Sequence, residues 1–116
     1  MRKQSWLFLL LFFIGITTVS AQKSAIYTHD LEAFNNALSL YNNGQYLSAQ
    51  IIFEKVKLEN KSSEVQSDCA YYSANCAIKS NQPNAEKLME RFLADYPTSI
   101  KQNQAFIEMA HYFFVQ

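Results

Sequence analysis

The chain has 116 residues, which is enough for one ordinary domain. Its apolar fraction of 49%, with only two Gly and two Pro, suits a packed helical domain better than a disordered or β-rich one. Ten basic residues balance ten acidic ones, so there is no basic surplus with which to bind nucleic acid.

The first 21 residues have the pattern of a secretory signal peptide. Arg2 and Lys3 supply the positive start, residues 6–16 form an apolar run, and compact residues 19–21 precede Gln22. The run is shorter than the roughly 20 residues of a membrane-spanning helix. No Cys near the cleavage point offers the acylation site of a bacterial lipoprotein. We therefore expect export and no membrane span in the mature chain; an uncleaved N-terminal anchor is the alternative.

Residues 22–28 are expected to be a flexible lead-in, and Thr28 is a suitable cap for the first helix. Four apolar residues then recur at the spacing of one helical face: Leu31, Phe34, Leu38 and Tyr41. Gly44 follows two asparagines and can take the left-handed conformation that ends helices. The pattern predicts a first helix that stops at residues 42–44.

Two more helices are expected before Ser80. The second helix begins at about Tyr46 and has an amphipathic apolar face: Ala49, Ile52, Phe53 and Val56. Ser63 and Gln66 have the spacing of a capping box, which predicts Ser63 as the cap of the third helix. The third helix has many small residues on its packing sides: Cys69, Ala70, Ala74, Cys76 and Ala77. Neighbouring helices can therefore approach it closely.

A fourth and a fifth helix complete the chain. Pro83 suits the first position of the fourth helix, where its missing N–H costs nothing. Tyr96 ends that helix, because the residue before a proline is disfavoured in the α conformation. The fifth helix is expected from about residue 99 or 100 and has an apolar side: Phe106, Met109, Ala110 and Phe113.

Cys69 and Cys76 would lie in an oxidising compartment after export, where a disulfide is the first expectation. Seven residues along a helix separate two Cα atoms by roughly 10 Å, beyond the limit of roughly 7 Å for a bridge. We therefore expect two small buried side chains on the packing face; intermolecular pairing or a strand-like local structure is the alternative. Neither His29 nor His111 is near them in sequence, so no metal site is expected.

Part of this helical pattern repeats. Three apolar positions of the second helix align with three of the fourth helix at a spacing of 36 residues: Ala49 with Ala85, Phe53 with Met89, and Val56 with Phe92. Together with Tyr41, Gly44 and Tyr46 they form a pattern that resembles the tetratricopeptide repeat (TPR), and Tyr96–Pro97 resembles the proline that ends such a repeat. The resemblance implies an all-α fold of antiparallel helix pairs stacked as a right-handed α-solenoid, with five helices after the signal peptide.

The same resemblance divides the chain into five parts: a signal peptide (1–21), a lead-in (22–28), a first repeat (29–61), a second repeat (62–97) and the first helix of a truncated third repeat (98–116). The second repeat departs from the pattern. Ser80 or Asn81 replaces the turn glycine, Gln82 replaces the tyrosine that follows it, and the register slips by one residue.

Residues 92–99, followed by Ala105 and Ala110, are similar to a phrase found in exported TPR proteins of the Gram-negative envelope, of the Tol–Pal-associated and β-barrel-assembly types. This resemblance implies a location in the periplasm or at the periplasmic face of the outer membrane.

In the repeat register, the next turn glycine would come at position 117. The fifth helix would then lack its partner and would present an uncovered apolar side: Phe106, Met109, Phe113 and Phe114. We expect the N-terminal part of a longer repeat array. A small domain that self-associates through this C-terminal helix is the alternative.

Stacked helix pairs form a concave groove along their first helices, in which a peptide or a partner helix can lie. By that geometry the candidate groove residues are Phe34, Leu38, Tyr41, Tyr71, Asn75 and Ile78. Burial in the core explains Phe34 and Leu38 better than partner contact does, whereas a phenol favours water or a partner. We expect an exported scaffold or adaptor for a protein or peptide partner; a dimerisation or sensor module of a membrane-anchored envelope receptor is the alternative.

No residue set supports catalysis. Glu86 and Glu90 are one helical turn apart, but Lys87 and Arg91 flank them, as on a solvated helix face. His111 lies on an amphipathic helix, where a structural or exposed position is the simpler explanation. The sequence therefore predicts no enzyme, no cofactor and no metal.

Overall fold

The computed structural model describes residues 31–115, so the expected signal peptide, the lead-in and His29 lie outside the described residues. Five helices make up the described part: residues 31–42, α3 (Tyr46–Glu59), α4 (Ser63–Lys79), α5 (Ala85–Asp95) and α6 (Gln102–Val115). This part contains no strand, and the prediction of an all-α fold is confirmed. Among its helices, none is long and apolar enough to span a membrane.

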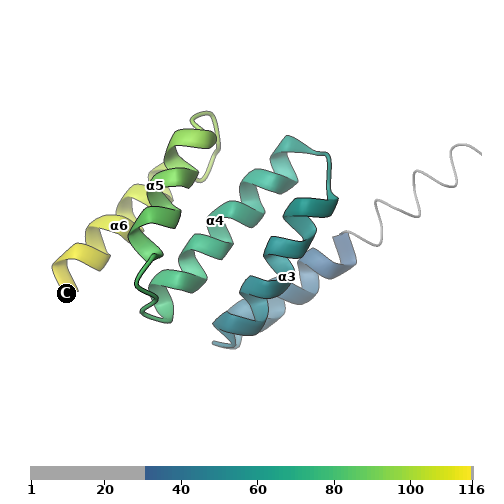
Figure 1. The fold of residues 1–116 in the computed structure, drawn as a ribbon, viewed down its shortest axis with the longest axis horizontal. Coiled ribbons are helices and arrows are strands. Elements are labelled where there is room, and N and C mark those ends of the chain that lie inside the picture. The colour runs from purple at the N-terminus through teal and green to yellow at the C-terminus, as the bar shows by residue number, and fades with distance from the viewer. Residues whose placement is uncertain (1–30, 116) are drawn as a thin grey trace, which may run out of the picture. The chain divides into compact units, whose positions relative to one another are not determined.

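Helix α4 is the central element of this arrangement (Figure 1). It packs between α3 and α5 and also contacts α6. The helix of residues 31–42 shares a core cluster with α3 and α4. Every described helix therefore touches α4.

Two clusters of buried side chains hold the helices together. The first joins residues 31–42 to α3 and α4: Ala37, Ala49, Phe53, Val56, Cys69 and Cys76. The second joins α4 to α5 and α6: Ala70, Tyr71, Ala74, Met89, Phe92 and Ala105. Small side chains on α4 allow close approach on both sides, as its sequence predicts. The prediction of two small buried cysteines on the packing face is also confirmed, because both are free thiols in the first cluster.

The turn after residues 31–42 is held by two backbone hydrogen bonds. The N–H of Gly44 donates to the carbonyl of Tyr41 at 3.1 Å, and the N–H of Gln45 donates to the carbonyl of Leu40 at 2.9 Å. Gly44 has a φ of +79°, in the left-handed region. This is the Schellman pattern that ends a helix, and it satisfies carbonyls that the helix leaves unpaired.

The turn after α4 repeats this structure with an asparagine. The N–H of Asn81 donates to the carbonyl of Ile78 at 3.2 Å, and the N–H of Gln82 donates to the carbonyl of Ala77 at 2.9 Å. Asn81 has a φ of +52°, a conformation that asparagine tolerates better than most residues. Of Ser80 and Asn81, the residue that replaces the turn glycine is therefore Asn81.

The start of α5 differs from the prediction. Pro83 and Asn84 lie in a turn closed by a hydrogen bond from the Ala85 N–H to the Gln82 carbonyl at 3.1 Å, and α5 begins only at Ala85. The expectation that Pro83 is the first helical residue is therefore wrong. This turn also accommodates the register slip, which lies between Gln82 and Ala85.

The predicted capping box of α4 is wrong as well. Ser62 is the cap residue, and no side chain makes a capping hydrogen bond there. The backbone N–H of Ser62 already donates to Asn60 Oδ1 at 2.8 Å. Gln66 Nε2 instead donates to the Asn60 carbonyl at 2.7 Å. In a capping box the glutamine side chain would accept the hydrogen bond from the N–H of the cap residue. Here the side chain of Asn60, in the preceding loop, accepts it.

Helix α6 begins at Gln102, two or three residues later than expected. The Gln102 side chain faces back to α5, where its Nε2 donates to the Tyr96 carbonyl at 2.7 Å and the Leu93 carbonyl at 3.2 Å. These carbonyls belong to the helix end, where intrahelical donors are missing. One side chain therefore ties the start of α6 to the end of α5.

Candidate partner-binding surface

The six predicted groove residues occupy equivalent positions on two helices. Those on residues 31–42 match those on α4 at a spacing of 37, which is also the spacing of Gly44 and Asn81: Phe34 with Tyr71, Leu38 with Asn75, and Tyr41 with Ile78. The equivalence follows from the two turns, which set the same end point for both helices.

Burial differs among these residues. Phe34, Leu38, Tyr41 and Ile78 are half-buried. By contrast, Tyr71 is 4% exposed and Asn75 is 1% exposed. The half-buried residues can touch a partner directly in this conformation, while Tyr71 and Asn75 lie beneath the surface and support the side chains around them.

Tyr72 of α4 joins the aromatic residues of this surface. Its ring is stacked on Phe53, with centroids 5.1 Å apart. It meets Tyr41 edge-on at 5.3 Å and Tyr71 at 5.2 Å, and Phe34 at 6.1 Å. The sequence places Tyr72 on the packing side of its helix. It does not distinguish Tyr72 from its neighbours, because the rings that contact it come from residues 31–42, from α3 and from α4 itself.

The rings of Phe34, Tyr41, Tyr71 and Tyr72 form what we call the aromatic surface. Lys101, just before α6, lies over it. Its Nζ is 5.3 Å from the centroid of the Tyr72 ring and 5.6 Å from that of Tyr71, within cation–π range. The same Nζ is 3.5 Å from the Tyr72 hydroxyl, to which it donates. Nothing in the sequence pattern marks Lys101, because the loop between α5 and α6 brings it there.

Besides burial, Glu108 of α6 raises the pKa of two phenols, those of Tyr41 in the helix of residues 31–42 and of Tyr71 in α4. Burial is the main cause that raises the pKa of Tyr71 to about 12; Glu108 raises it further, and a hydrogen bond from Asn75 lowers it. Burial likewise raises the pKa of Tyr41, with contributions from Tyr71 and Glu108. Both phenols therefore stay neutral near pH 7. Residues 31–42, α4 and α6 contribute to one local electrostatic environment.

Asn75 is the one fully buried amide of this surface with an unsatisfied atom among the described residues. Its Oδ1 has no hydrogen-bond partner. A buried acceptor without a partner costs about 1–3 kcal/mol. Asn75 is thus a local weakness in the packing beneath Tyr71 and Tyr41.

Metal-ligating clusters and cysteine thiols can be assessed within residues 31–115. No group of three or more His, Cys, Asp or Glu side chains in residues 31–115 is arranged to hold a metal ion. Burial raises the pKa of Cys69 and of Cys76 to about 12, so neither is a ready nucleophile. Glu86 and Glu90 are exposed on α5, as expected for a solvated face.

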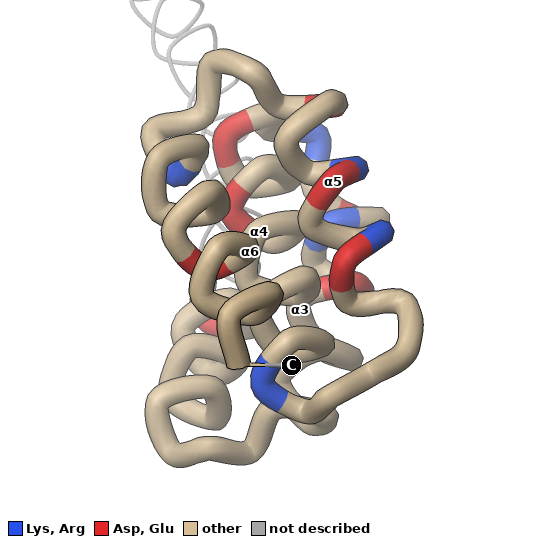
Figure 2. Tube along the Cα trace, turned by 90° about the vertical axis from the view of Figure 1, so that its left-hand side faces the viewer, with Lys and Arg blue, Asp and Glu red and all other residues tan. Residues whose placement is uncertain are grey.

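Helix α6 presents a second surface, which is apolar. It buries fully only Ala105 and exposes five large apolar side chains: Phe106, Ile107, Phe113, Phe114 and Val115. Charged positions follow one another along α5 but are nearly missing from α6 (Figure 2). The exposed fractions reach 91% at Phe114, which is unusual for a side chain of this size.

Comparisons of this chain with protein-family models, with curated proteins and with solved structures give no match.

Proposed function

We propose that this chain is an exported scaffold or adaptor of the TPR type, which binds a protein or peptide partner in the cell envelope. The observation that carries the proposal is the repeated turn. Gly44 and Asn81 end two helices with the same pair of backbone hydrogen bonds. The helix that follows each turn then buries a small residue completely, Ala49 in α3 and Ala85 in α5. Two helix pairs with matching turns and matching buried alanines are consistent with the units of a repeat array.

The composition of the aromatic surface supports a peptide as the occupant. Half-buried Tyr41, Phe34 and Leu38 offer apolar area, and the neutral phenol of Tyr41 offers a hydrogen bond. Lys101 and Glu108 add one charge of each sign at its edge. A mixed surface of this kind fits the apolar and polar groups of an extended peptide or a helix, and it favours neither nucleic acid nor a strongly charged ligand.

Site-specific photo-crosslinking in the exported protein tests this. A photoreactive residue at Tyr41 or Leu38 should give a discrete adduct with a partner protein. The matched control is Ile51, which is 70% exposed on α3. An adduct of equal yield from Ile51, or none from either groove position, would contradict the proposed groove. Fractionation should place the mature protein, with its N-terminus at Gln22, in the periplasm.

The exposed side of α6 supports the further proposal that another helix covers it in a longer array. The positions on α4 that face α5 are buried, whereas α6 leaves Phe106 and Phe113 more than half exposed. Sequencing of the gene beyond the Gln116 codon tests this: we expect a glycine, an aromatic residue and then an alanine in the repeat spacing. A stop codon at that point would refute it.

The same apolar side also favours the second candidate, a module that dimerises through α6 within a membrane-anchored receptor. Retention of residues 1–21 in the mature protein would support this candidate, and cleavage before Gln22 would exclude the N-terminal anchor.

A further inference from the structure

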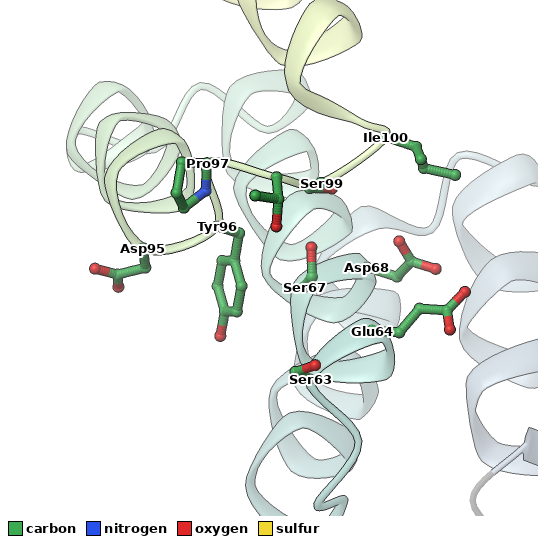
Figure 3. Close-up of a pocket in the computed structure, with 10 residues that line it drawn as sticks. Ser63, Glu64, Ser67, Asp68, Asp95, Tyr96, Pro97, Ser99 and Ile100 are labelled. Atoms are coloured by element: carbon green, nitrogen blue, oxygen red, sulfur yellow. The ribbon is translucent and has the colours of Figure 1, made fainter.

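A cavity of about 420 Å³ lies between the first two turns of α4 and residues 95–100, at the end of α5 and in the following loop, and none of the six predicted groove residues lines it. Three carboxylates line it, those of Glu64, Asp68 and Asp95, and no Lys, Arg or His does. Figure 3 shows Glu64 and Asp68 side by side on α4, while Asp95 points away from them. The cavity is therefore negatively charged on its α4 side.

Ser67 supplies an independent sign that a ligand belongs here. Its side chain is 7% exposed, lines the cavity, and has a hydroxyl without any hydrogen-bond partner. Figure 3 shows this hydroxyl pointing from α4 toward the loop at Ser99, with Tyr96 on one side and Asp68 on the other. A buried hydroxyl costs free energy unless it is hydrogen-bonded, and here a ligand that donates to it would remove that cost.

The electrostatics favour a cation. Burial raises the pKa of Asp68, the nearby Lys101 lowers it, and Glu64 raises it further. The positive charge of Lys101 therefore stabilises the Asp68 carboxylate less than burial and Glu64 destabilise it, and the pKa of Asp68 stays raised. Helix dipoles do not reverse this preference: the positive N-terminal end of α4 is opposed by the negative C-terminal end of α5, which has no basic residue in its last turn.

The other side of the cavity is mixed and partly aromatic. The ring of Tyr96 lines it together with Pro97 and Ile100, next to the polar Thr98 and Ser99. A planar cation with an aliphatic stem matches both sides, because a guanidinium can stack on a tyrosine ring while it donates several hydrogen bonds to carboxylates. A compact ammonium would use the carboxylates but not the ring.

We propose that this cavity binds the side chain of an arginine in a partner polypeptide. The guanidinium would donate to Glu64, Asp68 and the Ser67 hydroxyl, and it would lie against the Tyr96 ring. The site is additional to the aromatic surface and has its own test. A negative result for arginine binding in the cavity would therefore not contradict the proposed peptide binding at the aromatic surface, and the reverse also holds.

A titration of the mature chain with capped arginine, N-acetyl-arginine amide, tests the proposal by NMR shifts of residues around the cavity. The neutral isostere, capped citrulline, is the matched ligand. We expect arginine to bind at least about tenfold more tightly than citrulline, because charge-assisted hydrogen bonds are worth more than neutral ones. Equal binding of citrulline would overturn the proposal, and equal binding of capped lysine would overturn the guanidinium assignment. Shifts of the same residues with sulfate or phosphate but not with arginine would also overturn it.

Variants locate the binding. Asp68→Asn and Ser67→Ala should each weaken arginine binding, Asp68→Asn by about tenfold. Glu86→Gln removes the same charge from the exposed face of α5 and should leave it unchanged. Tyr41→Ala, on the aromatic surface, should also leave it unchanged. If Ser67→Ala fails to fold by circular dichroism, Glu64→Gln replaces it. Unaltered affinity in both Asp68→Asn and Glu64→Gln would exclude the cavity.

Discussion

At the scale of single residues, one tyrosine organises the surface that we propose for binding. Tyr72 contacts aromatic rings from residues 31–42, from α3 and from its own helix, and Lys101 reaches it from the α6 side. Each pair of aromatic rings adds about 0.5–1.5 kcal/mol beyond its buried area. Tyr72 is therefore expected to be a determinant both of stability and of the shape of the surface.

Replacement of Tyr72 separates these contributions. Tyr72→Ala should lower the free energy of unfolding by about 2 kcal/mol, less than for a fully buried ring because Tyr72 is half-buried. Tyr72→Phe keeps the stacking on Phe53 and loses only the contact of the hydroxyl with Lys101, so it should cost less than about 0.5 kcal/mol. Urea unfolding followed by circular dichroism measures both. Equal losses would show that the hydroxyl, and not the ring, matters.

The buried phenol of Tyr71 makes stability depend on pH in the alkaline range. Its pKa is about 12 in the folded state against an ordinary 10.0, so the folded state retains the proton longer than the unfolded state. This contribution is complete below pH 10 and is lost as the pH rises from 10 to 12. Urea unfolding at several pH values should show that loss. It should be shallower in Tyr71→Phe, and an unchanged slope in this variant would contradict the assignment.

At the scale of helices, the predicted apolar faces and the start of α3 were correct, whereas the predicted starts of α4, α5 and α6 were one to three residues off. Apolar spacing identified the faces that carry Phe53, Met89 and Phe92, because burial on one side leaves a period in the sequence. The starts of α4 and α6 depend on Gln66 and Gln102, whose amides bind carbonyls several residues away. Such bonds require a folded neighbour, so no local pattern shows them.

A pair of glutamines ties α3 to the turn before α5. Gln50 and Gln82 exchange two hydrogen bonds between their side chains, at 2.6 and 3.3 Å, and Gln50 is only 9% exposed. Gln82 occupies the position after the turn residue Asn81, as Gln45 does after Gly44. The expectation that Gln82 replaces the tyrosine at position 46 is therefore wrong. The pair connects the first helix pair to the second through polar groups, outside the two apolar clusters.

A double-mutant cycle on this pair measures the connection. Gln50→Ala and Gln82→Ala should each lower the free energy of unfolding by about 1 kcal/mol, and the double variant should lose less than the sum, because the first substitution already removes both bonds. Gln104→Ala removes an exposed bond to Glu108 and should change it by less than about 0.5 kcal/mol. Additive losses in the cycle would mean that the two amides do not stabilise each other.

At the scale of the whole described region, the sequence predicted the all-helical fold, but it showed only part of the two surfaces that we propose for binding. The resemblance to stacked helix pairs predicted six groove positions on two helices. It did not show that Tyr71 and Asn75 are only 4% and 1% exposed. For Tyr71 the cover comes from another part of the chain, because Met89 and Phe92 of α5 and Ala105 of α6 pack in the same cluster. The cavity at Ser67 was also not foreseen, since it forms where α4 meets a loop about thirty residues further along. Sites made between elements leave no period in the sequence.

The apolar side of α6 leads to a prediction about assembly. Between residues 102 and 115 the only carboxylate is Glu108, and Lys and Arg are missing, so little charge opposes contact between two such helices. Exposed aromatic area of this kind marks interaction sites.

For the mature chain ending at residue 116, we expect concentration-dependent dimers in sedimentation equilibrium. Phe114→Glu should shift them to monomers, because it would place a carboxylate in the apolar contact. Leu58→Glu, at a residue 86% exposed on α3, should not. If a chain extended by the next helix still dimerises as strongly, that helix does not cover α6, and the longer array loses its structural basis.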